Sequence, residues 1–181
     1  MIITTINQNK VELFDTYGVL YIGRAKFLFD LEDLPLIENR SWYVDKDRYL
    51  VSCYYYAGSR RFVRFHRIVM NAQAQEFVDH INKNRADNRK KNLRRCNRSE
   101  NDRNRGLYST NTSGVAGVFF DKKRGKWVAN ITYNSKKINL GRFVSKEDAI
   151  VARLRKEIEL FKEFAPQRKL WESLKEQGLV V

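Results

Sequence analysis

The residues best suited to chemistry are Asp79, His80, Asn92 and Asn101, which stand in a stretch dense in Lys and Arg. The imidazole of His80 titrates near neutral pH, so it can act as a general base toward water. Asp79 offers a carboxylate oxygen and Asn101 an amide oxygen, the kind of ligand that Mg²⁺ or Mn²⁺ prefers. Neighbouring residues of a strand point to opposite sides, so Asp79 can hold a metal while His80 holds a water. The pattern predicts metal-dependent hydrolysis of a phosphodiester.

Three local elements must position these side chains. Residues 77–80 and 93–96 are predicted strands, rich in apolar residues and joined by a long polar loop. Residues 97–100 resemble a capping box, the pattern that begins many helices. They predict a short helix that carries Asn101 and ends near Gly106. We therefore expect two strands and a helix around the reactive groups.

The order of His80, Asn92 and Asn101, together with the flanking run Asp87-Asn-Arg-x-x-Asn-Leu, resembles the motif of the HNH nucleases. It is the form in which Asn replaces the last His. The resemblance implies a ββα-metal nuclease core over residues 66–106 with double-stranded DNA as its substrate. The resemblance implies the same roles as above, a general base for His80 and metal ligands for Asp79 and Asn101. It also implies that Asn92 belongs to the catalytic residues, because Asn92 ties down the loop and orients His80. Because Asn101 stands where other members carry a His ligand, Zn²⁺ or Ni²⁺ is disfavoured.

Other polar residues near the motif have simpler interpretations. His66 is expected at the start of a helix beside the site, making a structural or a phosphate hydrogen bond. Asp87 is expected to anchor Arg85 or Arg89 and need not touch the metal. Three further loop residues are expected to satisfy backbone groups, namely Asn82, Asn84 and Asn88.

Residues 1–65 form a predicted β-rich region. Runs of β-branched and aromatic residues predict strands at 19–22, 26–29, 41–44, 49–56 and 61–65. Residues 34–37 are expected to start a short helix, because Pro35 fits the first turn. The region ends in Phe65–Met70, a short predicted helix. Similar β-rich leaders precede the nuclease motif in phage and intron HNH proteins.

Residues 107–181 form a predicted second DNA-binding region. Strands are expected at 115–120, 126–133 and 136–143. Ser145 caps a helix that is expected to run to about Phe164, and Pro166 then interrupts the helical pattern. One more short helix is expected at 168–178. The whole chain is therefore expected to be an α+β protein.

Four runs in this region resemble the AP2 DNA-binding domain, namely Ser113-Gly-Val-x-Gly-Val, Trp127-x-Ala-x-Ile, Leu140-Gly-x-Phe and Glu147-x-Ala. The resemblance covers about 50 residues and implies a three-stranded sheet whose outer face enters the major groove. Three positions depart from the plant pattern, so the target sequence does not carry over: Ala116, Phe119 and Asn139 stand where those factors have Arg, Arg and Trp.

Strand alternation divides the residues of this sheet between two faces. The face that packs on the helix is expected to hold Trp127, Ala129, Ile131, Ile138, Leu140 and Phe143. The opposite, DNA-facing side is expected to show Lys126, Val128, Asn130, Thr132, Lys137 and Asn139.

The net charge of +14 points to a polyanionic partner. Residues 79–105 carry ten basic and four acidic side chains, and residues 106–144 carry seven basic and one acidic. The excess therefore lies on the two predicted DNA-contacting regions. We expect contacts to DNA from Arg85, Arg89, Lys90, Lys91, Arg94, Lys122, Lys123, Arg124, Lys126, Asn130, Thr132, Lys137 and Asn139.

Composition indicates the cellular environment in which the protein is expected to work. Two cysteines, Cys53 and Cys96, and two histidines cannot readily make a four-ligand structural zinc site, and they favour a reduced, cytoplasmic environment. No apolar run approaches the roughly 18 residues of a membrane-spanning helix, so no membrane partner is expected. The expected location is the cytoplasm of a cell that hosts a phage or an intron-bearing genome.

The leading hypothesis is a site-specific homing endonuclease that acts as a monomer and nicks one strand, since one motif gives one active site. A dimer that cuts both strands of a palindrome is the alternative mode. Two other functions stay open: a phage nicking nuclease with another task, and a DNA-binding regulator whose nuclease site has decayed. The complete set of Asp79, His80, Asn92 and Asn101 argues against decay.

Overall fold

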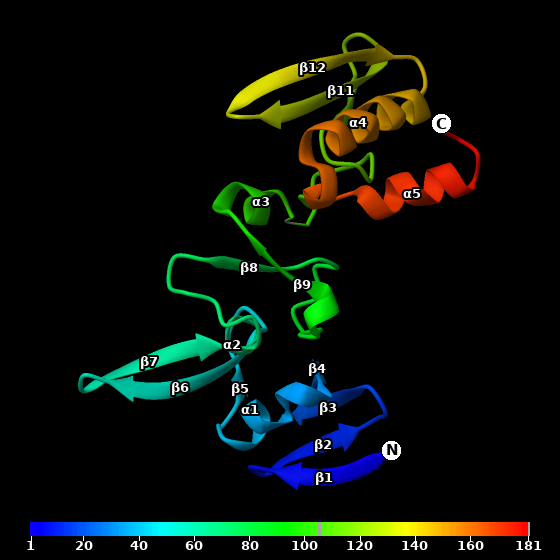
Figure 1. The fold of residues 1–181 in the computed structure, drawn as a ribbon. Coiled ribbons are helices and arrows are strands. Elements are labelled where there is room, and N and C mark those ends of the chain that lie inside the picture. Colours follow the sequence, from blue (N-terminus) through cyan, green and yellow to red (C-terminus); the bar gives the residue numbers. More distant parts are fainter. Residues whose placement is uncertain (105, 181) are drawn as a thin grey trace. The chain divides into compact units, whose positions relative to one another are not determined.

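The computed structural model describes residues 1–104 and 106–180. The chain is a mixed α+β protein built from several small antiparallel sheets, which confirms the predicted fold class at that level. It divides into two compact units, Met1–Asp102 (unit 1) and Arg103–Val181 (unit 2), and Figure 1 shows their elements. Among the described helices, none combines the length and the apolar character needed to cross a bilayer.

The first sheet of unit 1 is a four-stranded antiparallel meander. Its strands are β1 (Ile2–Ile6), β2 (Asn9–Leu13), β3 (Tyr17–Ile22) and β4 (Ala25–Asp30). β3 and β4 confirm the strands expected at 19–22 and 26–29, whereas the first hairpin was not individually predicted. Asn7 and Gln8 form its tight turn with φ angles of 49° and 66°, the left-handed conformation that such turns require.

A short helix and a second sheet follow. A 3-10 turn at Leu31–Asp33 leads into α1 (Leu34–Glu38), which has Pro35 in its first turn as expected. The sheet consists of β5 (Tyr43–Val44), β6 (Leu50–Tyr56) and β7 (Ser59–Arg64), in that spatial order. β7 runs directly into α2 (Phe65–Val69), the short helix expected at 65–70.

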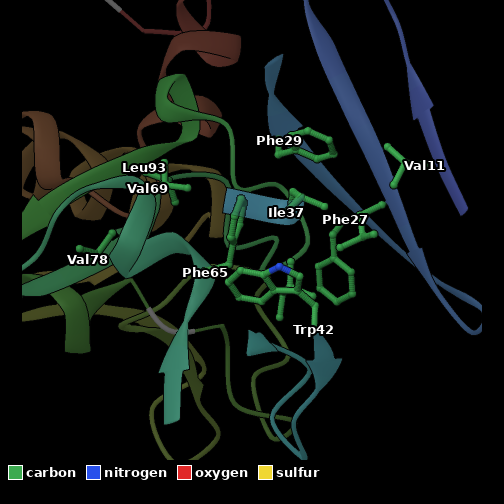
Figure 2. Close-up of a cluster of buried hydrophobic side chains, with 11 residues drawn as sticks. Val11, Phe27, Phe29, Ile37, Trp42, Phe65, Val69, Val78 and Leu93 are labelled. Atoms are coloured by element: carbon green, nitrogen blue, oxygen red, sulfur yellow. The ribbon is translucent and has the colours of Figure 1, made fainter. Parts of the chain in front are cut away.

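The hydrophobic core of unit 1 joins both sheets to residues 77–96, the segment that carries most of the predicted reactive residues (Figure 2). Trp42 and Phe65 meet edge to face at its centre, with ring centroids 5.0 Å apart. Val78 and Leu93, which flank the predicted reactive residues, are buried in the same core. Its other buried members are Val11, Leu20, Phe27, Phe29, Ile37, Leu50 and Val69. The N-terminal region therefore supports the reactive segment through packing as well as through chain connection.

The predicted strands of the reactive segment are present. β8 (Phe77–His80) pairs antiparallel with β9 (Leu93–Cys96), and α3 (Arg98–Arg103) follows β9. Asn97 and Glu100 form the reciprocal hydrogen bonds of a capping box at the start of α3, at 2.7 and 2.9 Å.

The end of α3 differs from the expectation. The helix ends at Arg103, before the end expected near Gly106, and Arg105 in that expected stretch lies outside the described residues. Asn101 is inside α3, and its backbone N–H donates to Asn97 O at 3.0 Å.

Unit 2 consists of a three-stranded antiparallel sheet and two helices. Its elements are β10 (Val118–Asp121), β11 (Lys126–Tyr133), β12 (Lys136–Phe143), α4 (Lys146–Phe161) and α5 (Arg168–Glu176). Ser145 caps α4, because its Oγ accepts a hydrogen bond from Asp148 N at 3.2 Å.

Two boundaries in unit 2 correct the sequence-based expectation. β10 begins at Val118 and not at residue 115, because Gly117, just before it, adopts a φ of 79° that interrupts an extended strand. α4 ends at Phe161, and the expected continuation to Phe164 is a 3-10 turn that begins at Lys162, whose φ is 47°.

The predicted inner face of the sheet packs against α4. Ala129 and Ile131 are buried, and the other predicted members pack partly buried against the same clusters: Trp127, Ile138, Leu140 and Phe143. The prediction for Val128 was wrong in one respect, since only 9% of this residue is exposed. Val128 lies on the outer face directly between Phe119 of β10 and Arg142 of β12, and these longer side chains leave it little accessible surface.

A buried carboxylate organises the polar interior of unit 2. Glu157 is fully buried and accepts a hydrogen bond from Arg153 Nη1 at 2.6 Å. It also accepts from the backbone and side-chain nitrogens of Gln167, at 2.7 and 2.8 Å. The Gln167 side chain in turn accepts from Ala116 N at 3.0 Å, so one network links α4 to both flanking segments.

We predict that Glu157→Ala strongly destabilises unit 2, because it leaves the buried guanidinium of Arg153 without its charge partner. Loss of one member of a buried ion pair costs about 3–5 kcal/mol. Urea unfolding followed by NMR of the Trp indole N–H signals measures this effect, since Trp127 and Trp171 report on unit 2 and Trp42 on unit 1.

The matched control is Glu159→Ala on the same helix. Glu159 is exposed and paired only at the surface with Lys156, so its removal should change the stability by less than about 1 kcal/mol. Equal unfolding midpoints for the two variants would contradict the role given to Glu157.

Candidate active site

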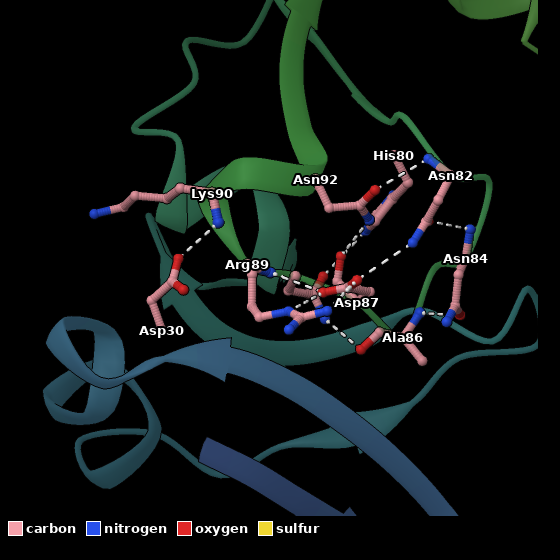
Figure 3. A network of polar contacts seen from close by, with 10 residues as sticks. Asp30, His80, Asn82, Asn84, Ala86, Asp87, Arg89, Lys90 and Asn92 are labelled. Atoms are coloured by element: carbon pink, nitrogen blue, oxygen red, sulfur yellow. Dashed lines mark hydrogen bonds and ion pairs between the residues drawn. The ribbon is translucent and has the colours of Figure 1, made fainter. Parts of the chain in front are cut away.

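The loop between β8 and β9 is folded by its own Asn and Asp side chains (Figure 3). Asn82 Oδ1 accepts a hydrogen bond from Asn84 N at 2.8 Å, and Asn84 Oδ1 accepts one from Ala86 N at 3.1 Å. These bonds replace the strand pairing that the loop lacks. Asn82 and Asn84 thus satisfy backbone groups, as the sequence suggests.

Asn92 joins the two ends of this loop. Its Nδ2 donates to Asp87 O at 2.8 Å, and its Oδ1 accepts from Asn82 N at 3.0 Å. Its backbone oxygen accepts from Ile81 N at 2.8 Å, beside the end of β8. Both polar atoms of the Asn92 side-chain amide are thus bonded to loop residues. Asn92 therefore holds the residues that follow His80.

Asp87 is the second organising residue of the loop. Its buried carboxylate pairs with Arg89 through two bonds of 2.7 and 2.8 Å and accepts from Asn82 Nδ2 at 3.2 Å. The guanidinium of Arg89 holds the pKa of the Asp87 carboxyl below its usual value. Of the two partners considered for Asp87, the structure shows Arg89 and not Arg85.

The folded loop is fastened to the N-terminal sheet. Leu28 of β4 donates to Ala86 O at 2.8 Å and accepts from Asn88 N at 2.9 Å. Asp30, at the end of β4, accepts from Lys90 N at 2.7 Å. Strand β4 therefore fixes both halves of the loop, and the loop fixes the residues at the ends of β8 and β9.

His80 lies at the end of β8 with only 4% of its surface exposed. Its Nε2 is 3.2 Å from Asn88 Oδ1, and an amide oxygen only accepts hydrogen bonds, so this contact places the imidazole proton on Nε2. Nδ1 then carries the lone pair that can take a proton from water. Burial lowers the pKa of His80 below its ordinary value, although the Asn88 bond and nearby carboxylates oppose this shift.

Two aromatic rings lie beside His80. The His66 ring lies 4.9 Å from the His80 ring, between centroids, in an edge-to-face arrangement. Tyr49 is 5.2 Å from His66 and 6.1 Å from His80. Burial, reinforced by His80 and nearby Arg residues, lowers the pKa of His66 to about 2. Both imidazoles are therefore neutral at physiological pH, as a general base must be.

Asp79 faces the other side of β8, as strand geometry predicts. It lies directly opposite Arg94 on β9, and Nη2 of Arg94 contacts Oδ2 of Asp79 at 3.0 Å. The carboxylate is buried, with 10% of its side chain exposed. Arg94, which the sequence suggested as a phosphate contact, thus compensates the charge of the predicted metal ligand.

The donor set can be tested against the expected metal. Within the described ranges, no three His, Cys, Asp or Glu side chains come together as ligands, so a metal cage built wholly from such side chains is not formed. Mg²⁺ is commonly held by one or two protein oxygens, with water and substrate phosphates completing its shell. The Asp79 carboxylate supplies one such oxygen, and its chemistry fits Mg²⁺ or Mn²⁺. The structure gives the position of Asn101 on α3 but no contact between its side chain and Asp79.

Most cations predicted to bind DNA in unit 1 are engaged within the protein. Arg89 pairs with Asp87, Lys90 with Glu32 at 2.6 Å, and Arg94 with Asp79. Arg85 donates to Asp47 O at 2.6 Å and stacks on the Tyr49 ring. Lys91 is exposed. These contacts brace the loop, and the DNA-binding role of the residues stays a prediction.

A basic groove of about 840 Å³ in unit 1 was not found by sequence reasoning. Residues 1–65 carry nine basic and eight acidic side chains, so their composition gives no signal. The fold nevertheless gathers three of these cations beside the loop between β8 and β9. The charged residues that line the groove are Arg24, Lys26, Arg48, Lys83, Arg85 and Asp47.

Unit 2 carries the other predicted DNA contacts. Asn130 lies directly opposite Asn139, and Thr132 opposite Lys137, on the sheet face turned away from α4. The β10–β11 turn presents exposed Lys122, Lys123 and Arg124, and Lys126 begins β11. The structure thus brings these residues onto one sheet and its adjoining turn.

Two contacts of the site were missed at the sequence level. Asn88 was expected only to satisfy loop backbone, but its side chain holds the His80 ring. Tyr49, far from the motif in sequence, lies beside both imidazoles. The Asp-Asn-Arg run already marked Asn88 as part of the motif, whereas nothing local marked Tyr49.

Comparison with known proteins identifies the family. The chain is 30% identical over 172 residues to an uncharacterized HNH endonuclease of Acanthamoeba polyphaga mimivirus, and the alignment covers 90% of this chain and 88% of that protein. The chain belongs to the HNH endonuclease family, which confirms the enzyme class predicted from the motif. No protein-family model matches it, and no solved structure matches it.

We predict that burial of His66 makes the protein less stable as the pH falls. The unfolded imidazole has a pKa of about 6.5 and takes up a proton below that pH, whereas folded His66 stays neutral. Each such group lowers the free energy of unfolding by up to about 1.4 kcal/mol per pH unit below pH 6.5. His66→Phe keeps a ring beside His80 and should flatten this dependence between about pH 5 and pH 6.5.

Urea unfolding at several pH values measures the slope, and Tyr49→Phe serves as the control, because it removes no group that titrates in this range. A His66→Phe slope equal to that of the wild type would show that His66 is not held neutral in the folded state.

Proposed function

We propose that this chain is a metal-dependent endonuclease that hydrolyses phosphodiester bonds of double-stranded DNA. The observation that carries the proposal is the environment of His80, a neutral imidazole whose Nε2 is fixed by Asn88 in a member of the HNH endonuclease family. A fixed ring with a lone pair on Nδ1 is what a general base toward water requires.

In the proposed reaction, water attacks the phosphorus and His80 Nδ1 accepts the proton that the water loses. The bond to the 3′ oxygen breaks, and this oxygen leaves with the electron pair. Asn88 keeps the imidazole in the tautomer whose lone pair is on Nδ1, and Asn92 acts through the loop as a positioning residue. Neutral His66 adds no positive charge that would disfavour proton uptake by His80.

Asp79 and Asn101 would hold Mg²⁺ or Mn²⁺ on the other side of β8. The ion supplies charge neutralisation for the phosphate and the leaving oxygen when bound. Arg94 contacts the Asp79 carboxylate and so competes with any cation for it. This competition favours binding of the ion together with the DNA phosphates over binding to the protein alone.

We further propose that residues 66–106 are a ββα-metal nuclease core and residues 107–181 an AP2-like reader of DNA. Support for the reader comes from the sheet packed on one helix, with polar pairs on its outer face. A three-stranded sheet can lie in the major groove, where Asn can pair with adenine and Lys with guanine or phosphate. Residues 1–65 support the core and contribute the basic groove.

The biological role follows as a narrower proposal. A nuclease with its own sequence reader suits a homing endonuclease of a phage or an intron, acting in the host cytoplasm. One motif in the chain favours a monomer that nicks one strand. A phage nuclease with another task is the second candidate, and the same site geometry supports it equally.

We predict that His80→Ala abolishes DNA cleavage while leaving DNA affinity within a few-fold, because the side chain is nearly covered and acts on water. Loss of a general base typically costs about 10²–10⁴-fold in rate. Nicking of supercoiled plasmid in Mg²⁺ and fluorescence anisotropy with a labelled duplex in metal-free buffer measure the two effects.

Replacement of Mg²⁺ by EDTA, and the variants Asp79→Ala and Asn101→Ala, should each remove the nicked product in the same assay. Cleavage by His80→Ala at the wild-type rate would remove His80 from the mechanism, and full wild-type activity in EDTA would remove the metal.

We also predict that Asn130→Ala and Lys137→Ala relax sequence preference at single base pairs. Each should cost about 1–3 kcal/mol of binding if the side chain reads a base edge. Selection from a randomised duplex library measures the preference, and Lys169→Ala on α5 is the control for charge removal away from the sheet. Unchanged selected sequences for both sheet variants would show that this face is not the reader.

A further inference from the structure

The β6–β7 hairpin of unit 1 exposes an unusual group of aromatic side chains. Tyr55, Tyr56 and Phe62 are 76%, 68% and 60% exposed, and Tyr54 is 43% exposed. Several exposed aromatic side chains on one short element mark an interaction site more often than single exposed residues do. None of these residues contributes to the buried core of unit 1.

The same hairpin is purely cationic. From Leu50 to Arg64 the sequence contains three Arg residues and no Asp or Glu. Arg60 lies directly opposite Tyr55, and Arg61 opposite Tyr54. Because side chains alternate along each strand, both faces of the ribbon combine aromatic rings with a guanidinium. On one face the Arg60 guanidinium lies over the Phe62 ring, 5.1 Å from its centroid.

The hairpin starts at the candidate active site. β7 runs without a break into α2, so His66 follows Arg64 by two residues. The Arg64 guanidinium stacks on the Tyr49 ring at 4.0 Å, and Tyr49 adjoins both imidazoles. Figure 1 shows β6 and β7 as a two-stranded ribbon that projects beyond α2. Six strand residues at about 3.3 Å each give a reach of about 20 Å.

We propose that the β6–β7 hairpin is an arm that lies in a groove of the DNA substrate next to the cleaved bond. Tyr55 and Tyr56 contact bases and sugars, while Arg60 and Arg61 contact phosphates. The major groove admits a two-stranded ribbon, where aromatic rings can contact base edges, thymine methyl groups and sugars. A reach of about 20 Å spans about six base pairs, so the tip contacts DNA about six base pairs from the cut. The proposal rests on duplex DNA as the substrate.

The charge of the hairpin favours DNA over a second copy of the chain. β7 is an edge strand of the sheet β5-β6-β7, and an edge strand is where another chain could pair. Arg64 is paired with Asp45 and Asp47. Arg60 and Arg61 on that edge, however, would meet the same two cations of a second copy pairing edge to edge. The phosphates on both sides of a DNA groove provide the complementary charge instead.

The test compares two double variants of the full chain, Tyr55→Ser with Tyr56→Ser and Arg60→Ser with Arg61→Ser. The control is the double variant Arg155→Ser with Lys169→Ser, which removes two exposed charges from the helices of unit 2. Binding to a labelled duplex is measured by fluorescence anisotropy over a range of salt in metal-free buffer. Hydroxyl-radical footprinting in Ca²⁺ maps the protected sugars.

We expect the Tyr variant to bind at least about ten-fold more weakly, since it loses the contacts of two aromatic rings with the groove. For the Arg variant, the slope of log K against log salt should fall by about 1.8, which corresponds to two lost phosphate contacts. Both variants should lose protection about six base pairs from the cut and keep it at the cut. The control should retain the protection about six base pairs from the cut as well as that at the cut.

Wild-type affinity and an unchanged footprint in both hairpin variants would overturn the proposal that the hairpin contacts DNA, even if the chain cleaves DNA. A dimer that forms without DNA and dissociates in the Tyr variant, seen by sedimentation, would also overturn it. Weaker binding by these variants of a chain that does not cleave DNA would support the arm while rejecting the proposed nuclease activity.

Discussion

The attachment of the β8–β9 loop to strand β4 is the constraint on which the candidate site depends. A polar loop of this length has no strand partner along most of its course, so its backbone groups need other hydrogen bonds. Asn82, Asn84 and Asn92 supply them from within, and Leu28 supplies two from β4. Asn88 holds His80 only because its own backbone is fixed in this way. The reactive imidazole is therefore positioned by the N-terminal sheet as much as by its own strand.

Burial and charge compensation divide the site into two halves. On the side of His80, apolar packing and two aromatic rings keep the imidazoles neutral, which suits proton transfer. On the side of Asp79, a guanidinium compensates a buried carboxylate, which suits exchange for another cation. One strand separates the two environments because adjacent residues point to opposite sides. In the proposed reaction the two neighbouring residues have separate tasks, proton uptake for His80 and metal binding for Asp79, and both act on the same phosphate.

Much of the local structure could be predicted because it is encoded locally. The capping box at Asn97, the Ser145 cap of α4 and the alternation of β11 and β12 all depend on residues a few positions apart. The first hairpin was not identified, because Ile2–Leu13 offers a weak turn signal, Asn7-Gln8, without glycine.

Contacts between distant segments could not be predicted. The Tyr49 ring reaches His66 and His80 only after β6 and β8 have packed around the core. The basic groove combines three cations from a region of almost neutral composition with Lys83 and Arg85 of the distant β8–β9 loop. Val128 occupies the expected face, yet Phe119 and Arg142 on the neighbouring strands leave it covered. Each of these outcomes depends on which strands pair, and a single strand does not contain that information.

The central claim is that a buried, neutral His80 serves as the base of metal-dependent DNA cleavage. The most direct test is the pH dependence of single-turnover plasmid nicking by the wild-type chain at saturating Mg²⁺. Because burial lowers the pKa of His80, the rate should stay high below pH 6.5 and fall only at a more acidic apparent pKa. No Mg²⁺-dependent nicking at any pH, or an acid limb centred above the ordinary imidazole value, would contradict the account.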